Sequence, residues 1–437
     1  MTGRAAAGLL LLVIVAAAVA LAVQRSDWAR LAWEEGAVAE SDYELHWAAG
    51  RALEAGLDPY DAGVVNELGR QTGRENTPFC AANPLVVRLF GLSPHLFTGY
   101  RAWRTWNLAL LGAGVLVLAS VLRAELGAGP GALAALAAGL GLIALNDGTW
   151  MAFYYNQTNV VTLLAVLLAL RAAQSGRDVT EGVLLALATA AKTSPALLLL
   201  VAALSGRWRT LLAGLGTLGL LLTASIAWTG AEVHASFLAM LKLRLGYAAN
   251  VPTGEFNNSL HDWNLAPNGL LSRAAEAGQW PRTWTLLAAW AVALVVLAAL
   301  GRRLRPRSDR PAPDVLTQYA AGILATFLVS SVTWTTHLSL AAVPCAWLLV
   351  RAWTERRPGL VPMLMLGAGA LATAVLFLPL GSFGEGLQLH ADILLKTDAC
   401  VLLFAVVLAF PQRDQPPTAA PSTGRTKASE GLMPSRR

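Results

Sequence analysis

The chain has 437 residues, of which 55% are hydrophobic and only 14% are charged. This composition excludes an ordinary soluble globular protein, in which charged residues make up about a quarter of the chain. The net charge of +6 does not indicate a nucleic-acid partner, because the basic residues lie in short links beside apolar segments, where membrane topology explains them.

The apolar segments recur along the chain at close to the length of a bilayer span. They predict an all-α, polytopic transmembrane protein with about ten spans. The expected spans are 5–23, 100–122, 128–145, 157–173, 210–229, 284–301, 315–333, 338–353, 360–380 and 393–411. The first follows a basic start, as a signal peptide does, but it is long enough to cross a bilayer, and we interpret it as an uncleaved helix.

The segment 180–204 determines the topology of everything that follows it. If it crossed the membrane once, the basic runs at 302–307 and 355–357 would lie outside the cell, which the positive-inside rule disfavours. Pro195 lacks an N–H and disfavours helix in the preceding residue, so Lys192-Thr193-Ser194-Pro195 predicts a break. We therefore predict two half-helices that form a re-entrant hairpin from the cytoplasmic side.

With this hairpin both termini are cytoplasmic, and most acidic residues lie outside. The outer segments 24–99 and 230–282 are far longer than ordinary connections, and such loops are usually functional. We expect one transmembrane domain over 1–411 in the plasma membrane, with its active site on the extracytoplasmic side. The tail at 412–437 has no apolar periodicity and is expected to be disordered.

The first outer segment contains a helix start that carries a carboxylate. Ser41-Asp42-Tyr43-Glu44 has the pattern of a capping box, with Ser41 at the N-cap. Asp42 is either a first-turn acid favoured by the helix dipole or a general base held above the membrane surface. Gly56-Leu57-Asp58-Pro59-Tyr60 ends this helix with a turn that presents Tyr60 towards the same region.

Two further features place polar groups against apolar segments. Asn156-Gln157-Thr158-Asn159 leads into a span, where amides need partners and commonly face a cavity, so these side chains can bind sugar hydroxyls. Lys192 lies within an apolar stretch, at a cost of about 2.5–3.5 kcal/mol unless its ammonium group is paired or hydrated. It is either close to a lipid phosphate or a buried carboxylate, or a snorkelling or structurally paired lysine.

Two polar clusters accompany the outer side of the predicted spans. Asn257-Asn258-Ser259 lies in the second outer segment, and Trp334-Thr335-Thr336-His337 lies between two spans. His337 can donate a hydrogen bond to a phosphate or orient a base. The sequence has no Gly-rich phosphate loop, which argues against a nucleotide-driven pump. Its three cysteines are scattered and suggest neither a disulfide framework nor a zinc site.

Taken in order, these motifs resemble glycosyltransferase family 87, whose members are polytopic GT-C-type enzymes and include polyprenol-phosphate-mannose-dependent mannosyltransferases. The resemblance runs from Asp42 to His337. It rests on Ser41-Asp42-Tyr43, Gly56-Leu57-Asp58-Pro59-Tyr60, Asn156-Gln157-Thr158-Asn159, Ala191-Lys192-Thr193-Ser194-Pro195, Asn257-Asn258-Ser259 and Trp334-Thr335-Thr336-His337.

The resemblance implies transfer of a sugar, with mannose as the first expectation, from a polyprenyl-phosphate donor in the membrane lipid to a hydroxyl of a glycolipid or polysaccharide acceptor, with inversion. It makes Asp42 the general base and gives His337 a catalytic role at the phosphate. The residues expected to bind substrate are Tyr43, Tyr60, Asn156, Gln157, Asn159, Lys192, Asn257, Asn258, Ser259 and Trp334. It implies no cofactor beyond the lipid-linked co-substrate, no metal ligands, and no obligatory divalent metal, because a monophosphate leaving group needs less charge compensation than a diphosphate.

Other functions remain open at this point. A pentosyl transferase that uses polyprenyl-phosphate arabinose would need the same motifs. A lipid or solute transporter would also use an intramembrane Lys192 and a broken helix, although its polar residues would concentrate at the membrane midplane rather than at the outer edge. A structural partner in a cell-wall complex would tolerate replacement of Asp42.

Overall fold

The computed structural model describes residues 30, 33, 34, 38, 41–70, 80–127, 131–244, 264–306, 312–355, 360–377 and 387–411. Within these residues every regular element is a helix, which confirms the predicted all-α class. The predicted first span at 5–23 and the predicted disordered tail at 412–437 lie outside the described residues.

The helices of the described residues come in the following order along the chain. They are α3 (Asp42–Glu54), α4 (Ala62–Arg70), α5 (Pro84–Gly91), α6 (Leu96–Leu126), α7 (Ala132–Ala144), α8 (Asp147–Tyr154), α9 (Asn159–Gln174), α10 (Asp178–Ala191), α11 (Ala196–Leu204), α12 (Trp208–Thr229), α13 (Ala231–Arg244), α14 (Pro267–Ala277), α15 (Arg282–Leu304), α16 (Val315–Val329), the 3-10 helix η2 (Thr335–Ala341), α17 (Ala342–Thr354), α18 (Leu360–Phe377) and α19 (Leu387–Ala409).

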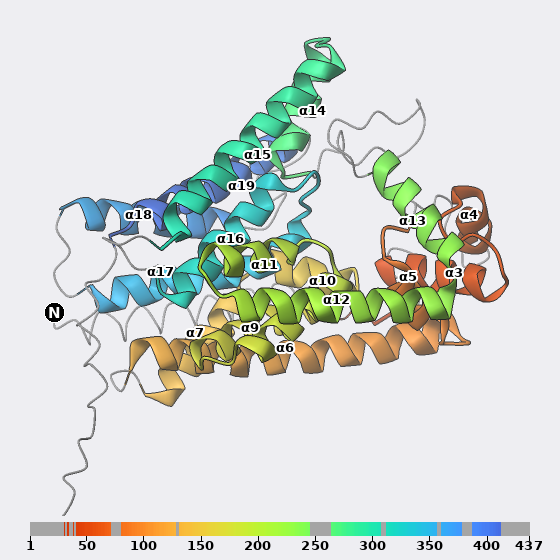
Figure 1. The fold of residues 1–437 in the computed structure, drawn as a ribbon, viewed down its shortest axis with the longest axis horizontal. Helices are drawn as coiled ribbons and strands as arrows, with labels where there is room; N and C mark the ends of the chain where they lie inside the picture. Colours follow the sequence, from red (N-terminus) through yellow and green to blue (C-terminus); the bar gives the residue numbers. More distant parts are fainter. Residues whose placement is uncertain are drawn as a thin grey trace, which may run out of the picture.

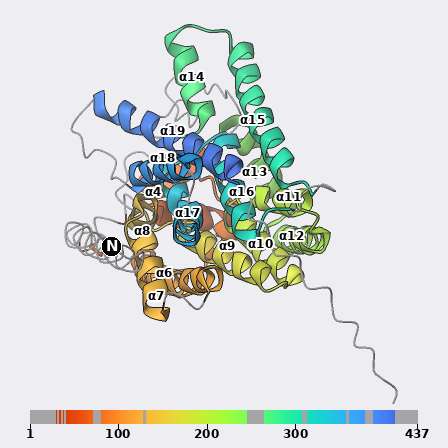
Figure 2. The same cartoon turned by 90° about the vertical axis from the view of Figure 1, so that its left-hand side faces the viewer.

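The long axis of the molecule is set by two helices. Figure 1 shows α6 and α12 along this axis, with α9 and α10 beside them and with α3, α4, α5 and α13 gathered at the right-hand end. The view along the axis in Figure 2 shows α16 and α17 among the other helices. Leu316 to Leu328 of α16 are all buried, because α16 packs against α9, α11, α15, α17 and α19. The core of the bundle therefore forms around α16.

Several helices are apolar enough to indicate a membrane protein, but the predicted count of about ten spans is not confirmed. Among the described residues, four helices are long and apolar enough to cross a bilayer, or up to five if the bent pair α7 and α8 forms one span. The four lie at Leu96–Leu126, Trp208–Thr229, Thr283–Leu304 and Leu360–Phe377. Three other predicted spans, 157–173, 315–333 and 338–353, fall on helices that are too short, because a perpendicular crossing needs about 20 residues. The helix α9, for example, has only 16.

The predicted reversal between α10 and α11 is present in the structure. Glu181, near the start of α10, pairs with Arg207, which follows α11, and accepts a hydrogen bond from Thr210 Oγ1 at 2.9 Å. A Cβ atom on Gly182 would lie 2.3 Å from the carbonyl oxygen of Thr210, so the starts of α10 and α12 are in direct contact. The two half-helices therefore return to the end at which they began. Their entry into a membrane stays a prediction.

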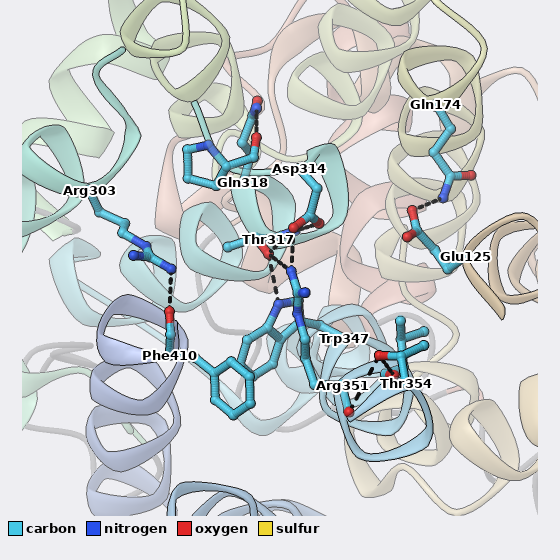
Figure 3. A network of polar contacts seen from close by, with 12 residues as sticks. Glu125, Gln174, Arg303, Asp314, Thr317, Gln318, Trp347, Arg351, Thr354 and Phe410 are labelled. Carbon is cyan, nitrogen blue, oxygen red and sulfur yellow. Dashed lines mark hydrogen bonds and ion pairs between the residues drawn. The ribbon is translucent and has the colours of Figure 1, made fainter. Parts of the chain in front are cut away.

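Buried polar networks lie at this same end, which we call the far end because α3 lies at the opposite one. Tyr319 in the first turns of α16 donates a hydrogen bond to Glu181 at 2.8 Å. Asp314, the N-cap of α16, pairs with Arg351 near the end of α17, as Figure 3 shows. The far end is thus fastened by charge-assisted hydrogen bonds between α10, α16 and α17.

Candidate functional site

The helix start that carries Asp42 forms as predicted. Ser41 has extended backbone angles, and its hydroxyl accepts a hydrogen bond from the N–H of Glu44 at 3.4 Å, as an N-cap residue does. Asp42 is half-buried, and its own N–H donates to the carbonyl oxygen of Tyr155 at 2.9 Å. The side-chain amide of Gln157 donates to its carboxylate. The link between α8 and α9 therefore fixes both the backbone and the side chain of Asp42.

The helix α3 is held in place by a close crossing with α5. A Cβ atom on Gly50 would lie 2.5 Å from both N and Cα of Gly91, so only glycine at position 50 allows this approach. Trp47 Nε1 donates to the carbonyl oxygen of Ser93 at 2.9 Å. The crossing and this hydrogen bond determine where α3 places Asp42.

Lys192 faces the same region from the break in the hairpin. It is the C-cap residue of α10, in extended conformation, and its Nζ donates to Oδ1 of Asn159 at 2.5 Å. Lys192 lies outside the helices that can cross a membrane. Burial lowers its pKa to about 8, while the negative charge of Asp42 acts in the opposite direction. The carboxylate and the ammonium group are therefore close enough to influence each other.

His337 lies on η2 and approaches the same group of residues. Its Nδ1 accepts a hydrogen bond from the N–H of Trp334 at 3.3 Å. Burial lowers the pKa of His337 well below its ordinary value, and the positive charge of Lys192 lowers it further. The ring is therefore neutral, with its proton on Nε2. This nitrogen is buried and has no hydrogen-bond partner among the described residues.

Other buried donors near His337 also lack partners within the described part of the chain. They are Nδ2 of Asn159 and the hydroxyl groups of Thr335 and Thr336. Because η2 packs against α9, these donors belong to the same end of the bundle as Lys192. Buried polar groups are normally hydrogen-bonded, so a concentration of free donors beside an ammonium group suits an anionic ligand.

Besides Gln157, Asn159 and Lys192, four further residues that are predicted to bind substrate make contacts within the protein. Tyr43 is buried and its ring lies 5.1 Å from that of Phe90. The hydroxyl of Tyr60 donates to the carbonyl oxygen of Ala82 at 2.8 Å. Trp334 is the N-cap of η2. Their roles towards substrate stay predictions.

Asn156 is the fourth of these residues. It has a φ of 54°, a conformation that asparagine tolerates better than most residues. Its Nδ2 donates to the carbonyl oxygen of Tyr100 at 3.2 Å, and its Oδ1 accepts from Asn107 at 3.0 Å. Asn156 thus ties the link between α8 and α9 to α6. The predicted residues Asn257, Asn258 and Ser259 lie outside the described residues.

One residue at this site is absent from the sequence-based prediction. His46 follows Asp42 by one turn of α3, its ring lies 5.1 Å from that of Phe90, and its Nδ1 is buried with no partner among the described residues. Burial lowers the pKa of His46, while the charge of Asp42 raises it. His46 follows Asp42 by four residues, so both side chains lie on one face of the helix. This spacing could have identified His46 from the sequence.

A comparison with protein families decides the classification. The family model of glycosyltransferase family 87 matches residues 77–331, which is more than half of the chain. The chain belongs to glycosyltransferase family 87. No curated protein matches it. The matched part contains Gln157, Asn159 and Lys192, whereas Asp42 and His337 lie on either side of it. Membership confirms the predicted resemblance and supports a membrane glycosyltransferase.

Proposed function

We propose that this family 87 glycosyltransferase transfers a mannosyl group from a polyprenyl-phosphate donor to an acceptor hydroxyl of a glycolipid or polysaccharide on the extracytoplasmic side of the plasma membrane. The observation that carries the proposal is the link between α8 and α9. Gln157 holds the carboxylate of Asp42, and two residues later Asn159 holds the ammonium group of Lys192. One short segment thus holds both the proposed base and the proposed cation, which supports this proposal.

In the proposed reaction Asp42 acts as the general base. The acceptor oxygen forms a bond to the anomeric carbon on the face opposite the phosphate, and the bond between that carbon and the phosphate oxygen breaks with inversion. The acceptor proton passes to the carboxylate of Asp42, and the lipid phosphate leaves with the electron pair. A positioned base of this kind contributes about 10²–10⁴-fold to the rate.

The leaving phosphate needs positive charge and hydrogen-bond donors. Lys192 supplies the charge, and His337 Nε2–H and the amide of Asn159 supply donors. We propose that these groups make a divalent metal dispensable. Turnover should then persist in excess EDTA, and its loss on chelation with recovery on adding Mg²⁺ would refute this part of the proposal.

The test is radiolabelled sugar transfer by the purified protein in detergent, with a membrane lipid extract as acceptor. Polyprenyl-phosphate mannose and polyprenyl-phosphate arabinose are offered separately to the wild type and to Asp42→Asn. The matched control is Asp61→Asn, because Asp61 also lies at a helix start, where it accepts from the N–H of Gly63 at 2.8 Å. Asparagine retains this capping function.

We expect product with the mannosyl donor, unchanged product from Asp61→Asn, and a loss of at least a hundredfold in Asp42→Asn. Product with the arabinosyl donor alone would replace mannose by a pentose and leave the mechanism unchanged. Equal product from Asp42→Asn would remove Asp42 from the mechanism. No transfer with either donor would favour the transporter alternative, which a liposome uptake assay then addresses.

A further inference from the structure

A buried ion pair connects the last described helix to the helix that packs on η2. Lys396 in α19 donates from Nζ to Oδ2 of Asp147 at 3.0 Å, and the two side chains are only 2% and 5% exposed. Asp147 is the first residue of α8. Replacing a buried ion pair by apolar residues is often neutral or stabilising, so stability alone does not explain this pair.

The residues at the start of α8 that flank Asp147 contact η2 directly. Asn146, which precedes Asp147, donates from Nδ2 to the carbonyl oxygen of Leu338 at 2.8 Å and to that of Ser339 at 3.3 Å. A Cβ atom on Gly148 would lie 2.5 Å from the Ser339 nitrogen and from the Thr335 carbonyl oxygen. The residues on both sides of Asp147 thus contact the backbone of η2 without a gap.

The neighbour of Lys396 holds the segment that leads into η2. Thr397 Oγ1 donates to the carbonyl oxygen of Leu265 at 2.8 Å. The N–H of Leu265 in turn donates to the carbonyl oxygen of Thr333 at 2.7 Å. Asn264 Oδ1 accepts from the N–H of Thr333 at 3.0 Å. Two successive residues of α19 therefore restrain η2. Lys396 does so through Asp147 and α8, and Thr397 does so through Leu265 and the segment that precedes η2.

We propose that Lys396 and Asp147 form a positioning pair that fixes η2, and thereby aims Nε2–H of His337 at the phosphate of the lipid donor. This inference rests on the proposed function. It makes α19, which lies outside the residues matched by the family model, part of the catalytic unit. Lys396 does not touch the reacting atoms. It acts through α8 and η2, on a site whose other members lie on α3 and at the break after α10.

The test compares variants of this pair with a matched control at the far end. Lys396→Met removes the ammonium group beside the buried carboxylate of Asp147, Lys396→Arg keeps the charge, and Asp147→Asn with Lys396→Met removes both charges and guards against failure to fold. The control is Arg351→Met, because Arg351 is also buried, with 8% of its side chain exposed, and also pairs with a carboxylate, that of Asp314, which is 35% exposed. All variants are assayed as full-length protein in detergent, well below their unfolding temperatures.

We expect Lys396→Met and the double variant to raise KM for the lipid donor about tenfold or more with KM for the acceptor unchanged, and Lys396→Arg to recover most of the loss. Arg351→Met should lower Tm without changing donor KM. An unchanged donor KM in Lys396→Met, or an equal increase in Arg351→Met, would overturn the proposal.

A second readout does not depend on turnover and separates this inference from the proposed function. Hydrogen exchange of the η2 amides, measured by mass spectrometry, should become faster in Lys396→Met and in the double variant but not in Arg351→Met. If the wild type transfers no sugar and exchange still responds in this way, the proposed function fails and the positioning role of the pair stands. If exchange at η2 is the same in Lys396→Met and wild type, the positioning role fails.

Discussion

At the residue scale, two amides of one link determine how the charged groups of the site are held. The side chain of Gln157 donates a hydrogen bond to the carboxylate of Asp42, and that of Asn159 accepts one from Lys192. Neither amide carries charge, so each can orient its partner without cancelling the charge that the chemistry uses. Orientation matters because a misplacement of about 1 Å can cost a hundredfold in rate.

We therefore predict that Gln157→Ala lowers kcat about ten- to a hundredfold, because the carboxylate of Asp42 loses its fixed direction. The matched control is Gln174→Ala. Gln174 also donates an amide hydrogen bond to a carboxylate, that of Glu125 at 2.7 Å, but at the other end of α9 (Figure 3). Steady-state kinetics of both variants check the prediction, and equal kcat values for the two would contradict it.

Lys192 gives a pH prediction. Its pKa is lowered to about 8, so the ammonium group is charged below that pH and becomes a neutral amine above it. The free enzyme should therefore lose kcat/KM for the anionic donor as the pH rises through about 8. Lys192→Arg keeps its charge throughout this range and should lack the alkaline decline, even if its activity is lower. The same decline in Lys192→Arg would assign it to another group.

Residue types were predictable at this scale, whereas their partners were not. Lys192 and His337 are predicted because charged or titratable groups beside apolar segments are costly. Asp42 is predicted because it opens a helix with a capping-box pattern. Lys396 is a charged residue within the predicted span 393–411, but it is absent from the residues predicted to act at the site. Its partner Asp147 is 249 residues away, and no local pattern connects the two.

At the element scale, local chemistry placed the helix ends well. The Ser41 cap and the break at Lys192-Thr193-Ser194-Pro195 appear where the sequence predicts them, because side-chain capping and the missing N–H of proline act within a few residues. Crossing a bilayer is a different property. Hydropathy detects an apolar segment, but α16 is apolar because it is the buried centre of the bundle, and it has only 15 residues.

The contact between α8 and η2 leads to a prediction about a single methyl group. Gly148→Ala would place Cβ 2.5 Å from two backbone atoms of η2, so η2 must move. Overpacking of this kind costs about 1–3 kcal/mol. We expect a lower Tm together with a higher KM for the lipid donor, because His337 moves with η2.

The matched control is Gly216→Ala on α12, where the added Cβ meets no atom within 4 Å. Alanine is the better helix former, so this variant should keep its activity and its Tm. Thermal unfolding and donor kinetics on both variants decide the matter. A Gly148→Ala enzyme with wild-type donor KM would show that η2 tolerates the displacement.

At the scale of the whole molecule, the two ends of the bundle have different characters. The far end carries ion pairs and hydrogen bonds that fasten helices to one another, such as Glu181 with Arg207. The end with α3 carries a half-buried carboxylate and, on neutral side chains, buried donors without partners among the described residues. Buried donors without such partners also occur at the far end, for example Nε of Arg207 and of Arg351, but these two side chains already form ion pairs. Only the fold brings the latter groups together, since Asp42, Lys192 and His337 come from three separate parts of the chain. Their common location could not be read from sequence spacing.

The hairpin predicts which side of the membrane each end of the bundle faces. The ends of α11 and α15 are neighbours, since a Cβ atom on Gly301 would lie 3.9 Å from Leu204, and α12 begins beside them. Arg209 and Arg305 are exposed at this end, and Glu232 is exposed beyond the other end of α12. Single cysteines at these three positions can be read without background, because the native Cys80, Cys345 and Cys400 are buried.

In intact cells, an impermeant maleimide should label Glu232→Cys and leave Arg209→Cys and Arg305→Cys unlabelled until the membrane is permeabilised. Arg209→Cys and Arg305→Cys must behave alike, because they flank the same end of the bundle. Glu232→Cys must differ from both, because the 22-residue α12 is long and apolar enough to cross the membrane between positions 209 and 232. Labelling of Arg209→Cys and Arg305→Cys from opposite sides would contradict the hairpin. Labelling of both from outside, with Glu232→Cys shielded, would keep the hairpin and invert the protein, which would move Asp42 and Lys192 to the cytoplasmic face.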